Sequence, residues 1–240
     1  MFVAMTYNVA NGLARPNDLT TALRGSFADV IGLEELAADQ AIAIERDLAD
    51  LYPHQTLHPL GIPGKGVISR FPIRSAELID LYPDRPDLLV RIEAPHGLMR
   101  VIVAHPPPPR FRRSGLRFDQ QTRVQIDALV ELAASDGPTI LMGDFNAPER
   151  HRSLRQIAGA GFIDAFKTAG EGGGLTLPMR LARFAYQGSR LGDIRIPPML
   201  RVDYIWHTRE FRTISAWVGE HAGSDHLPVL ARMELTPAGT

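Results

Sequence analysis

Short apolar runs rich in Val, Ile and Leu recur along the whole chain and alternate with stretches whose apolar residues have helical spacing. Runs of this length are typical of strands, and their alternation with amphipathic helices is typical of a layered α/β or α+β domain. We expect strands at residues 2–8, 29–33, 66–69, 88–93, 99–104, 139–142, 202–207 and 229–235. We expect helices at residues 17–24, 39–51, 118–134 and 151–158.

Two segments show neither pattern. Residues 105–117, and the stretch from residue 170 to about residue 200, contain prolines and glycines that are incompatible with regular structure. Segments of this kind often form loops that surround a functional site. We therefore expect irregular loops in both places.

The size and composition of the chain favour one domain. The chain has 240 residues, of which 45% are apolar, and this suits one sizeable core over residues 1–240 better than two very small ones. It has no cysteine, which excludes disulfides and thiolate ligands and fits a reducing compartment. No window reaches the roughly 20 apolar residues of a transmembrane span, and the N-terminus does not resemble a signal peptide. We expect a cytoplasmic monomer.

Polar residues follow the ends of several predicted strands and recur near the C-terminus. Residues just past the carboxyl ends of buried strands are held rigidly yet exposed, so groups from distant parts of the sequence can converge on one cleft. Each residue alone has a structural explanation, such as a turn, but their joint occurrence favours a functional site. The residues are Asn8, Glu34, Glu35, His105, Asp144, Asn146, Asp203, Asp225 and His226.

The types of these residues point to one kind of chemistry. Asparagine and carboxylate oxygens, with few histidines and no cysteine, suit a hard cation such as Mg²⁺ or Mn²⁺ better than zinc. A phosphoester is the natural substrate for such an ion. Displacement at phosphorus needs charge neutralisation, a nucleophile held in line and help for the leaving oxygen.

Seven short motifs occur in a fixed order along the chain. They are TYNV (6–9), DVIGLEE (29–35), GVISRFPI (66–73), VIVAH (101–105), ILMGDFN (140–146), RVDYI (201–205) and GSDHLPV (223–229). In sequence and in order they resemble the motifs of the endonuclease/exonuclease/phosphatase superfamily. The resemblance implies the DNase I-like fold, an α/β (α+β) four-layer sandwich in which two mixed β-sheets pack face to face between helices.

The resemblance also implies a set of metal ligands. Glu35 would be the principal ligand, with Asn8, Asp225 and Asp144 close to the same ion. Adjacent side chains of a strand point to opposite faces, so we expect only one of the two glutamates to share a face with Asn8. Glu34 stands where the family usually has glutamine. We expect it to form a salt bridge or to point to solvent, although a second carboxylate near the ion could tighten metal binding.

The remaining members of the set would act on the substrate. Asp144 and Asn146 would position the attacking water and the phosphate. His226 would be the general base, with activity rising around pH 6–7, or an electrostatic stabiliser. Asp203 would fix the tautomer of His226. His105 would bind the phosphate or assist the leaving group.

Arginines in the two loops are candidate substrate-binding residues. The net charge of −1 gives no general basic field, so any binding to nucleic acid must be local. The alternative is that these arginines are solvated charges without a ligand. The predicted substrate-binding residues are Arg110, Arg112, Arg113, Arg180 and Arg201.

Three classes of function remain open. The first is a metal-dependent phosphodiesterase, most simply a nuclease, that hydrolyses a phosphoester by in-line attack of an activated water. The second is a phosphatase or phospholipase that acts on a small or lipid phosphate. The third is a binding module without catalysis, which the completeness of the residue set disfavours. We favour the first.

Overall fold

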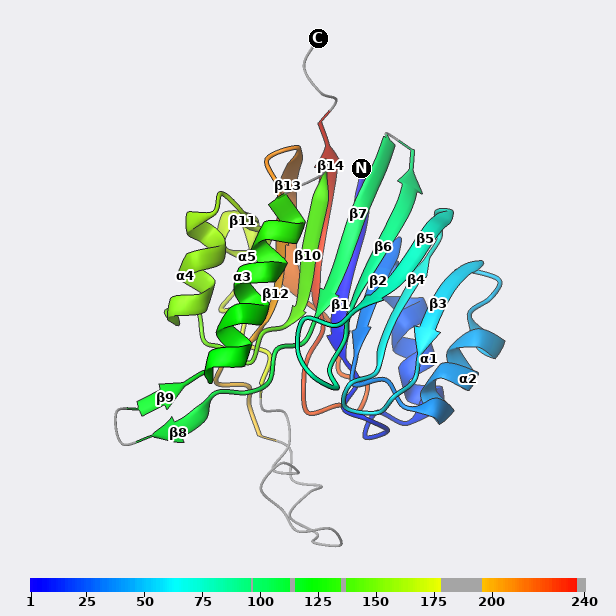
Figure 1. Ribbon diagram of the computed structural model, residues 1–240. Coiled ribbons are helices and arrows are strands. Elements are labelled where there is room, and N and C mark those ends of the chain that lie inside the picture. The colour runs from blue at the N-terminus through cyan, green and yellow to red at the C-terminus, as the bar shows by residue number, and fades with distance from the viewer. Residues whose placement is uncertain (96, 113–114, 135–136, 178–195, 237–240) are drawn as a thin grey trace, which may run out of the picture.

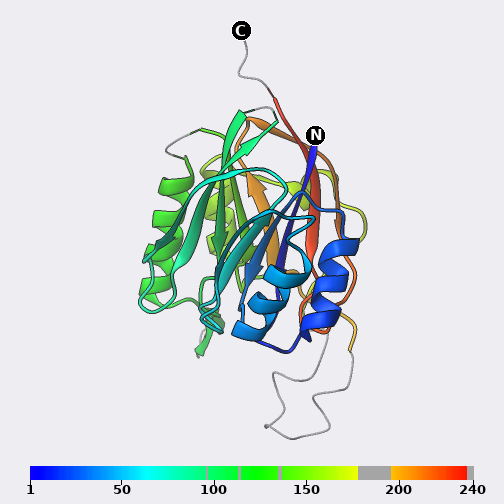
Figure 2. The same cartoon turned by 90° about the vertical axis from the view of Figure 1, so that its right-hand side faces the viewer.

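The computed structural model describes residues 1–95, 97–112, 115–134, 137–177 and 196–236. Two six-stranded mixed β-sheets pack face to face, and helices cover their outer faces (Figures 1 and 2). The predicted four-layer sandwich is therefore confirmed. In the described part of the chain, no helix is both long and apolar enough to cross a membrane.

The first sheet contains the N-terminal strand at its centre. Its β1 and β2 are parallel, and its other neighbouring strands are antiparallel. Two helices, α1 (Pro16–Gly25) and α2 (Ala38–Asp47), pack on its outer face through an apolar cluster. The order of the strands is β13 (Phe211–Val218), β14 (Val229–Leu235), β1 (Phe2–Asn8), β2 (Val30–Glu34), β4 (Lys65–Ser69) and β3 (His54–His58).

The second sheet is covered by α3 (Gln120–Ala134) and α4 (Arg152–Gly159). The short helix α5 (Ala165–Ala169) contributes to the core between the two sheets. A separate hairpin of β8 (Arg110–Arg112) and β9 (Gly115–Arg117) projects from the body of the molecule (Figure 1). The order of the strands in the second sheet is β11 (Ile163–Asp164), β12 (Asp203–His207), β10 (Thr139–Asp144), β7 (Gly97–Ala104), β6 (Asp87–Ala94) and β5 (Ile73–Ile79).

The two sheets approach closely near their centre. Gly32 of β2 faces the second sheet, and a Cβ atom at this position would lie 2.8 Å from Met142 Cε and from Val103 Cγ2. A larger residue would therefore push the sheets apart. The close approach brings the strand ends of the two sheets within reach of one another.

All eight predicted strands and all four predicted helices are present, and several further elements were not predicted. The second predicted helix ends earlier, at Asp47 instead of residue 51. The prediction that residues 105–117 lack regular structure is wrong, because this segment contains the β8–β9 hairpin. The missed elements are short or carry polar residues: β3, β5, β8, β9, β11, β13 and α5.

Candidate active site

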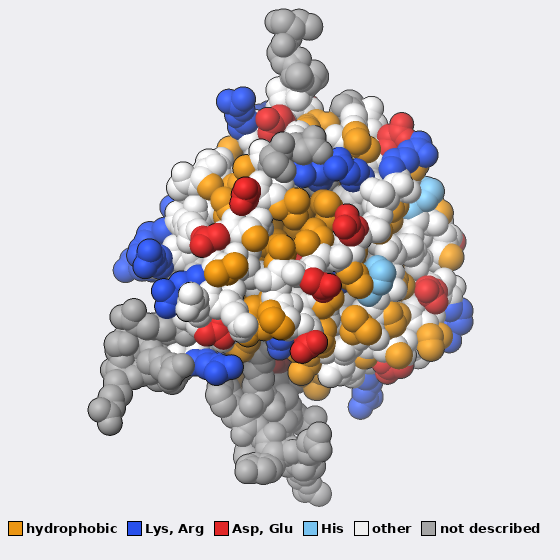
Figure 3. Space-filling model, in the orientation of Figure 1, with side chains coloured by type: hydrophobic (Ala, Val, Ile, Leu, Met, Phe, Trp, Pro, Cys, Tyr) orange, Lys and Arg blue, Asp and Glu red, His pale blue; other side chains and the backbone are white. Residues whose placement is uncertain are grey.

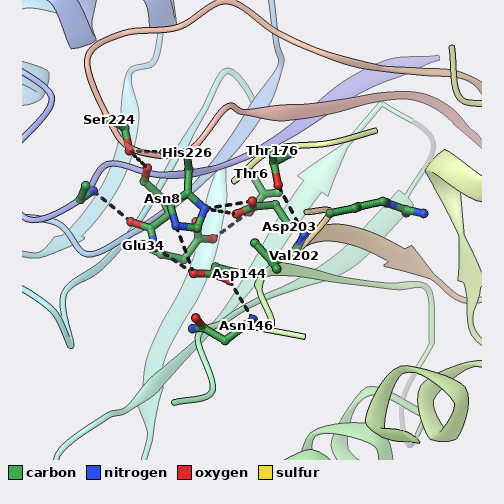
Figure 4. A network of polar contacts seen from close by, with 12 residues as sticks. Thr6, Asn8, Glu34, Asp144, Asn146, Thr176, Val202, Asp203, Ser224 and His226 are labelled. Atoms are coloured by element: carbon green, nitrogen blue, oxygen red, sulfur yellow. Dashed lines mark hydrogen bonds and ion pairs between the residues drawn. The ribbon is translucent and has the colours of Figure 1, made fainter. Parts of the chain in front are cut away.

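Strand ends from both sheets meet at one end of the sandwich. In the first sheet β1 ends at Asn8 and β2 at Glu34, and in the second sheet β7 ends at Ala104 and β10 at Asp144. The loop between β13 and β14 brings His226 to the same place, as Figure 4 shows. The polar side chains at these ends therefore share the space between the two sheets.

The two adjacent glutamates both lie on the side of Asn8. Asn8 and Glu34 are neighbours in the parallel register of β1 and β2, so their side chains share a face. Thr6 Oγ1, on the same face, donates a hydrogen bond of 2.7 Å to Glu34 Oε1. Glu35 follows the end of the strand with φ of 53°, and its Oε1 accepts a hydrogen bond of 3.3 Å from Asn8 Nδ2. The expectation that only one glutamate faces this side is therefore wrong.

Glu34 is fully buried, so the expectation that it points to solvent is also wrong. Burial raises the pKa of its carboxyl group well above the ordinary value, and the charges of Asp203 and Asp144 add to this effect. Its Oε2 atom is buried without a hydrogen-bond partner among the described residues. This departure from the family pattern thus adds an acidic group to the interior of the site.

Asn8 links the ends of the two sheets. Its Nδ2 atom, which contacts Glu35, also donates a hydrogen bond of 3.1 Å to Asp144 Oδ2. Asp144 Oδ1 accepts a hydrogen bond of 2.8 Å from the backbone N–H of Asn146. The Asn146 side chain donates to the carbonyl of Pro106 at 3.0 Å. Four of the predicted site residues are therefore joined by hydrogen bonds.

His226 and Asp203 form a buried pair. His226 Nδ1 lies 3.0 Å from Asp203 Oδ2, and its Nε2 lies 3.6 Å from Asp144 Oδ2. Ser224 fixes the loop, because its Oγ atom donates to the carbonyl of Asn8 at 2.6 Å and accepts the backbone N–H of His226 at 3.0 Å (Figure 4). Asp203 thus holds Nδ1 of the imidazole, whereas Nε2 lies near Asp144 but is buried without a hydrogen-bond partner among the described residues.

The carboxylates around His226 control its charge. Burial alone would lower its pKa, but Asp203, Asp144 and Asp225 outweigh this effect and raise the pKa of His226 to about 10. Asp225 is itself buried. Without a bound cation these carboxylates therefore favour the imidazolium form of His226. The neutral base expected from the sequence, titrating around pH 6–7, stays a prediction.

His105 completes the group on the side of β7. Its Nε2 atom lies 3.5 Å from Asp144 Oδ2 and 3.6 Å from Glu35 Oε1. Its backbone N–H donates a hydrogen bond of 3.1 Å to Asp87 Oδ1. His105 is almost completely buried. It is thus placed between the same two carboxylates that contact Asn8.

The donor set fits a hard divalent cation. Glu35 and Asp144 are two carboxylates bridged by one amide, and a divalent cation bound beside them would offset their buried like charges. A second group, Asp144, Asp203 and His226, has ligand atoms within 4.8 Å of one another. Asp203 and His226 already bind each other in that group, so we favour the Glu35 and Asp144 carboxylates as the ligand side of the site. Asn8 lies beside them, with its amide nitrogen on both carboxylates and its oxygen accepting the N–H of Ala10.

Most of the predicted arginines cannot be placed against this site. Arg113 and Arg180 lie outside the described residues, and the side chain of Arg112 is not described either. Arg110 lies on β8, and its side chain is exposed. Only Arg110 therefore has a described position that suits contact with a substrate outside the body of the molecule.

Arg201 does not lie on an exposed rim. Its side chain is buried, and its guanidinium forms an ion pair with Asp164. It also lies over the rings of Phe166 and Tyr204, at 5.0 Å and 4.5 Å from the ring centroids. The predicted role of Arg201 in substrate binding is corrected to a structural role beside Asp203.

Lys65 and Asp87 were missed from the sequence although both are buried beside the site. Each is the polar residue at the amino end of a strand, β4 or β6. These strands are antiparallel to β2 and β7, respectively, so their amino ends lie at the site. The detectable signal was a charged residue directly before a predicted apolar strand.

Residues 5–226 match the model of the Endonuclease/Exonuclease/phosphatase family. The chain therefore belongs to this family. No functionally curated protein matches it in sequence.

Several solved structures share the fold of this chain. An endonuclease/exonuclease/phosphatase from Beutenbergia cavernae is 19% identical, with a TM-score of 0.73 over 98% of this chain and 72% of the other. D. rerio TDP2 complexed with a single-strand DNA product is 17% identical, with a TM-score of 0.72 over 97% of this chain and 98% of the other. The 3′ phosphatase NExo from Neisseria, bound to a product DNA hairpin, is 17% identical, with a TM-score of 0.69 over 98% of this chain and 100% of the other.

Proposed function

We propose that this protein is an Mg²⁺- or Mn²⁺-dependent phosphodiesterase, most simply a nuclease. The observation that supports the proposal is the convergence of carboxylates, amides and two histidines from both sheets at one end of the sandwich. A fold without catalysis has no physical need to bury so many acidic groups together. Membership of the family supports hydrolysis of a phosphoester.

Glu35, Asn8, Asp144 and Asp225 are the proposed metal-binding residues. Bound there, a divalent cation would neutralise charge on the phosphate oxygens. Asn8 donates its amide hydrogens to the two carboxylates and thereby holds them at a fixed separation. Buried carboxylates without water around them attract a cation more strongly than exposed ones.

His226, Asp203, Asn146 and His105 are the proposed catalytic residues. His226 Nε2 faces the shared space, while Asp203 holds Nδ1. A cation nearby would oppose the carboxylates that raise the pKa of His226, so the histidine could then accept a proton from the attacking water. Asn146 and His105 would orient the phosphate and the leaving group.

A nucleic acid is the favoured substrate class. The solved relatives TDP2 and NExo are described with DNA products. Arg110 is exposed on the projecting hairpin. Arg112, Arg113 and Arg180 stay candidates from the sequence, because their side chains lie outside the described part of the structure. The broad face in Figure 3 carries acidic side chains around an apolar centre, so we do not expect a polyanion to bind there.

A phosphatase is the second candidate. NExo is described as a 3′ phosphatase bound to DNA, so the same fold also accommodates removal of a terminal phosphate. The monomeric state and the cytoplasmic location stay predictions from the sequence.

A substrate panel tests the proposal. Wild-type protein is incubated with Mg²⁺, Mn²⁺ or EDTA and with single-stranded DNA, duplex DNA, RNA, 3′-phosphorylated DNA and bis-p-nitrophenyl phosphate. We expect cleavage of nucleic acid that needs the cation, and loss of several orders of magnitude in turnover for His226→Ala and Asp144→Asn. Near-normal turnover in either variant, or full activity in EDTA, would contradict the proposal.

A further inference from the structure

The backbone of β7 runs past its ladder with β6 before it reaches the site. The antiparallel pairs of β6 and β7 end at Leu88 and Val103, so His105 lies beyond the last of them. Four prolines follow His105, and proline has no N–H group to continue a ladder. His105 therefore carries the last backbone N–H before the proline run, and in this buried residue that donor needs an acceptor.

A side chain supplies the acceptor. Asp87 is the first residue of β6 and is fully buried, and its Oδ1 atom accepts the His105 N–H at 3.1 Å. The carboxylate thus takes the place that a backbone carbonyl would hold in a longer ladder. A hydrogen bond to an ionised acceptor is roughly twice as strong as one between neutral groups, so this bond is well suited to fix the end of a strand.

Helix α3 holds the Asp87 carboxylate from its other side. Gln125 is also fully buried, and its Nε2 atom donates a hydrogen bond of 2.9 Å to Asp87 Oδ2. Burial raises the pKa of Asp87 to about 6, while Lys65 and the bonds from Gln125 and His105 oppose this effect. The two bonds use one carboxylate oxygen each and thereby hold the carboxylate in one orientation.

The imidazole of His105 extends from this anchored backbone into the site. Its Nε2 atom lies 3.5 Å from Asp144 Oδ2 and 3.6 Å from Glu35 Oε1. A residue before a proline is restricted to extended conformations, and the Asn146 side chain donates to the carbonyl of Pro106 at 3.0 Å. The backbone that carries the imidazole is therefore fixed on both sides, at its N–H group and at the following carbonyl.

We propose that Asp87 and Gln125 are positioning residues, which fix the imidazole of His105 beside the reacting phosphate by holding the His105 N–H. Asp87 acts through the backbone of His105, and Gln125 acts through Asp87. The inference rests on the proposed function, because it concerns the placement of His105 in the same site. A misplacement of about 1 Å can lower turnover roughly 10²-fold, so loss of the bond should be measurable in catalysis.

Substitutions of the two residues separate the hydrogen bonds from the charge. Asp87→Ala removes both acceptors. Asp87→Asn keeps an oxygen for the His105 N–H, and its amide can donate to Gln125 Oε1, which is buried without a partner among the described residues. Gln125→Glu alone places two buried carboxyl groups against each other. The double variant Asp87→Asn/Gln125→Glu restores both hydrogen bonds and moves the carboxylate to α3.

Asp29→Ala is the matched control. Asp29 Oδ2 accepts the backbone N–H of Val3 at 2.8 Å, so this substitution also removes a carboxylate that holds the backbone of a strand. Val3 lies near the start of β1, whereas Asn8 at the end of β1 belongs to the site. The control therefore removes the same kind of bond at the opposite end of a strand.

The backbone amide of His105 reports the bond without a metal ion. Protein labelled with [¹⁵N]histidine contains eight labelled histidines, and His105→Ala identifies the resonance of His105. In EDTA at neutral pH we expect Asp87→Ala to speed hydrogen exchange of the His105 amide about tenfold or more. The amide of His207 in β12 should not change, and the double variant should restore protection of His105. Asp29→Ala should leave the His105 amide as in wild type.

Turnover tests whether the bond acts through His105. With Mg²⁺ and bis-p-nitrophenyl phosphate, we expect Asp87→Ala to lower kcat/KM about 10–100-fold in the wild-type background and hardly at all in the His105→Ala background. The double variant should recover most of the loss, whereas Asp29→Ala should leave kcat/KM unchanged. Should Asp87→Ala not fold, Gln125→Glu with and without Asp87→Asn gives the same comparison.

A purely structural role of Asp87 would lower kcat/KM by the same factor in both backgrounds, and this result would overturn the inference alone. Exchange of the His105 amide in Asp87→Ala at the wild-type rate, or equal acceleration at His105 and His207, would also overturn it alone. A wild-type protein without cation-dependent hydrolysis would overturn the proposed function and the inference together.

Discussion

At the scale of single residues, the site depends on hydrogen bonds that hold one orientation. Asp203 Oδ2 lies 3.0 Å from Nδ1 of His226, so that the other ring nitrogen, Nε2, faces Asp144. Asp203→Asn keeps the shape but removes the charge that holds this arrangement. We expect turnover of bis-p-nitrophenyl phosphate with Mg²⁺ to fall by about 10²–10⁴-fold. The unfolding temperature serves as the control, and turnover close to wild type would contradict the role of Asp203.

The raised pKa of Asp87 should make the stability of the protein depend on pH. Burial raises this pKa to about 6 in the folded protein, above the ordinary value of 3.8, so the folded state binds more protons between these two pH values. The contribution of Asp87 to the free energy of unfolding is therefore greatest below pH 4 and is lost as the pH rises through 6. Between pH 4 and pH 7 we expect the free energy of unfolding of wild type to fall by about 2–3 kcal/mol relative to that of Asp87→Asn.

Urea unfolding of both proteins in EDTA, at several pH values, measures this difference. EDTA removes cation binding as a second source of pH dependence. A difference between the two proteins that stays constant from pH 4 to pH 7 would show that Asp87 keeps an ordinary pKa.

At the scale of elements, the end of β10 requires glycine. Gly143 has φ of 145°, and a Cβ atom there would lie 1.9 Å from the carbonyl oxygen of Ala104 at the end of β7. We expect Gly143→Ala to lower the free energy of unfolding by about 2 kcal/mol or more, because both the backbone conformation and the contact oppose a side chain. Gly159→Ala in α4 is the control, since nothing lies within 4 Å of its added Cβ atom. Chemical denaturation of the two variants tests the difference.

The arginines of the β8–β9 hairpin should affect binding of nucleic acid more than binding of a small diester. If its arginines contact nucleic acid through phosphates, binding should weaken steeply as salt rises. Replacing Arg110, Arg112 and Arg113 by alanine should raise the KM for an oligonucleotide and reduce its salt dependence. Hydrolysis of bis-p-nitrophenyl phosphate, a small diester without neighbouring phosphates, should hardly change. Equal losses on both substrates would place these arginines at the reacting phosphate, and no loss on either would make them solvated charges.

At the scale of the whole molecule, a bound cation should stabilise the fold. The proposed ligands come from both sheets, on β1, β10 and the turn after β2, so the site exists only when the sandwich is formed. A ligand that binds only the folded state raises stability by mass action, by about 2.7 kcal/mol at a hundred times its dissociation constant. We expect Mg²⁺ and Mn²⁺ to raise the unfolding temperature of wild type, and Glu35→Gln to lose most of this rise. Calorimetry with and without EDTA measures both.

Local patterns were sufficient for much of the fold. The apolar runs gave β1, β2, β7, β10 and β14, because buried strands need such runs wherever they lie. Edge strands such as β3, which is only half buried, need fewer apolar residues and were missed. The hairpin in the proline-rich segment was missed because prolines before a strand do not prevent pairing after it.

The sequence by itself determined the family, the layered architecture and the residues that gather at the site, because motif order and hydrophobic period are local properties. Only the tertiary structure decided the direction of each side chain. Glu35 reaches Asn8 through a positive φ that no strand pattern predicts, and Arg201 turns inward to Asp164. Lys65 and Asp87 are buried beside the site because antiparallel strands of the two sheets bring their amino ends there. Burial and charge at one place depend on groups that are distant in sequence, and this is why they could be determined only from the folded chain.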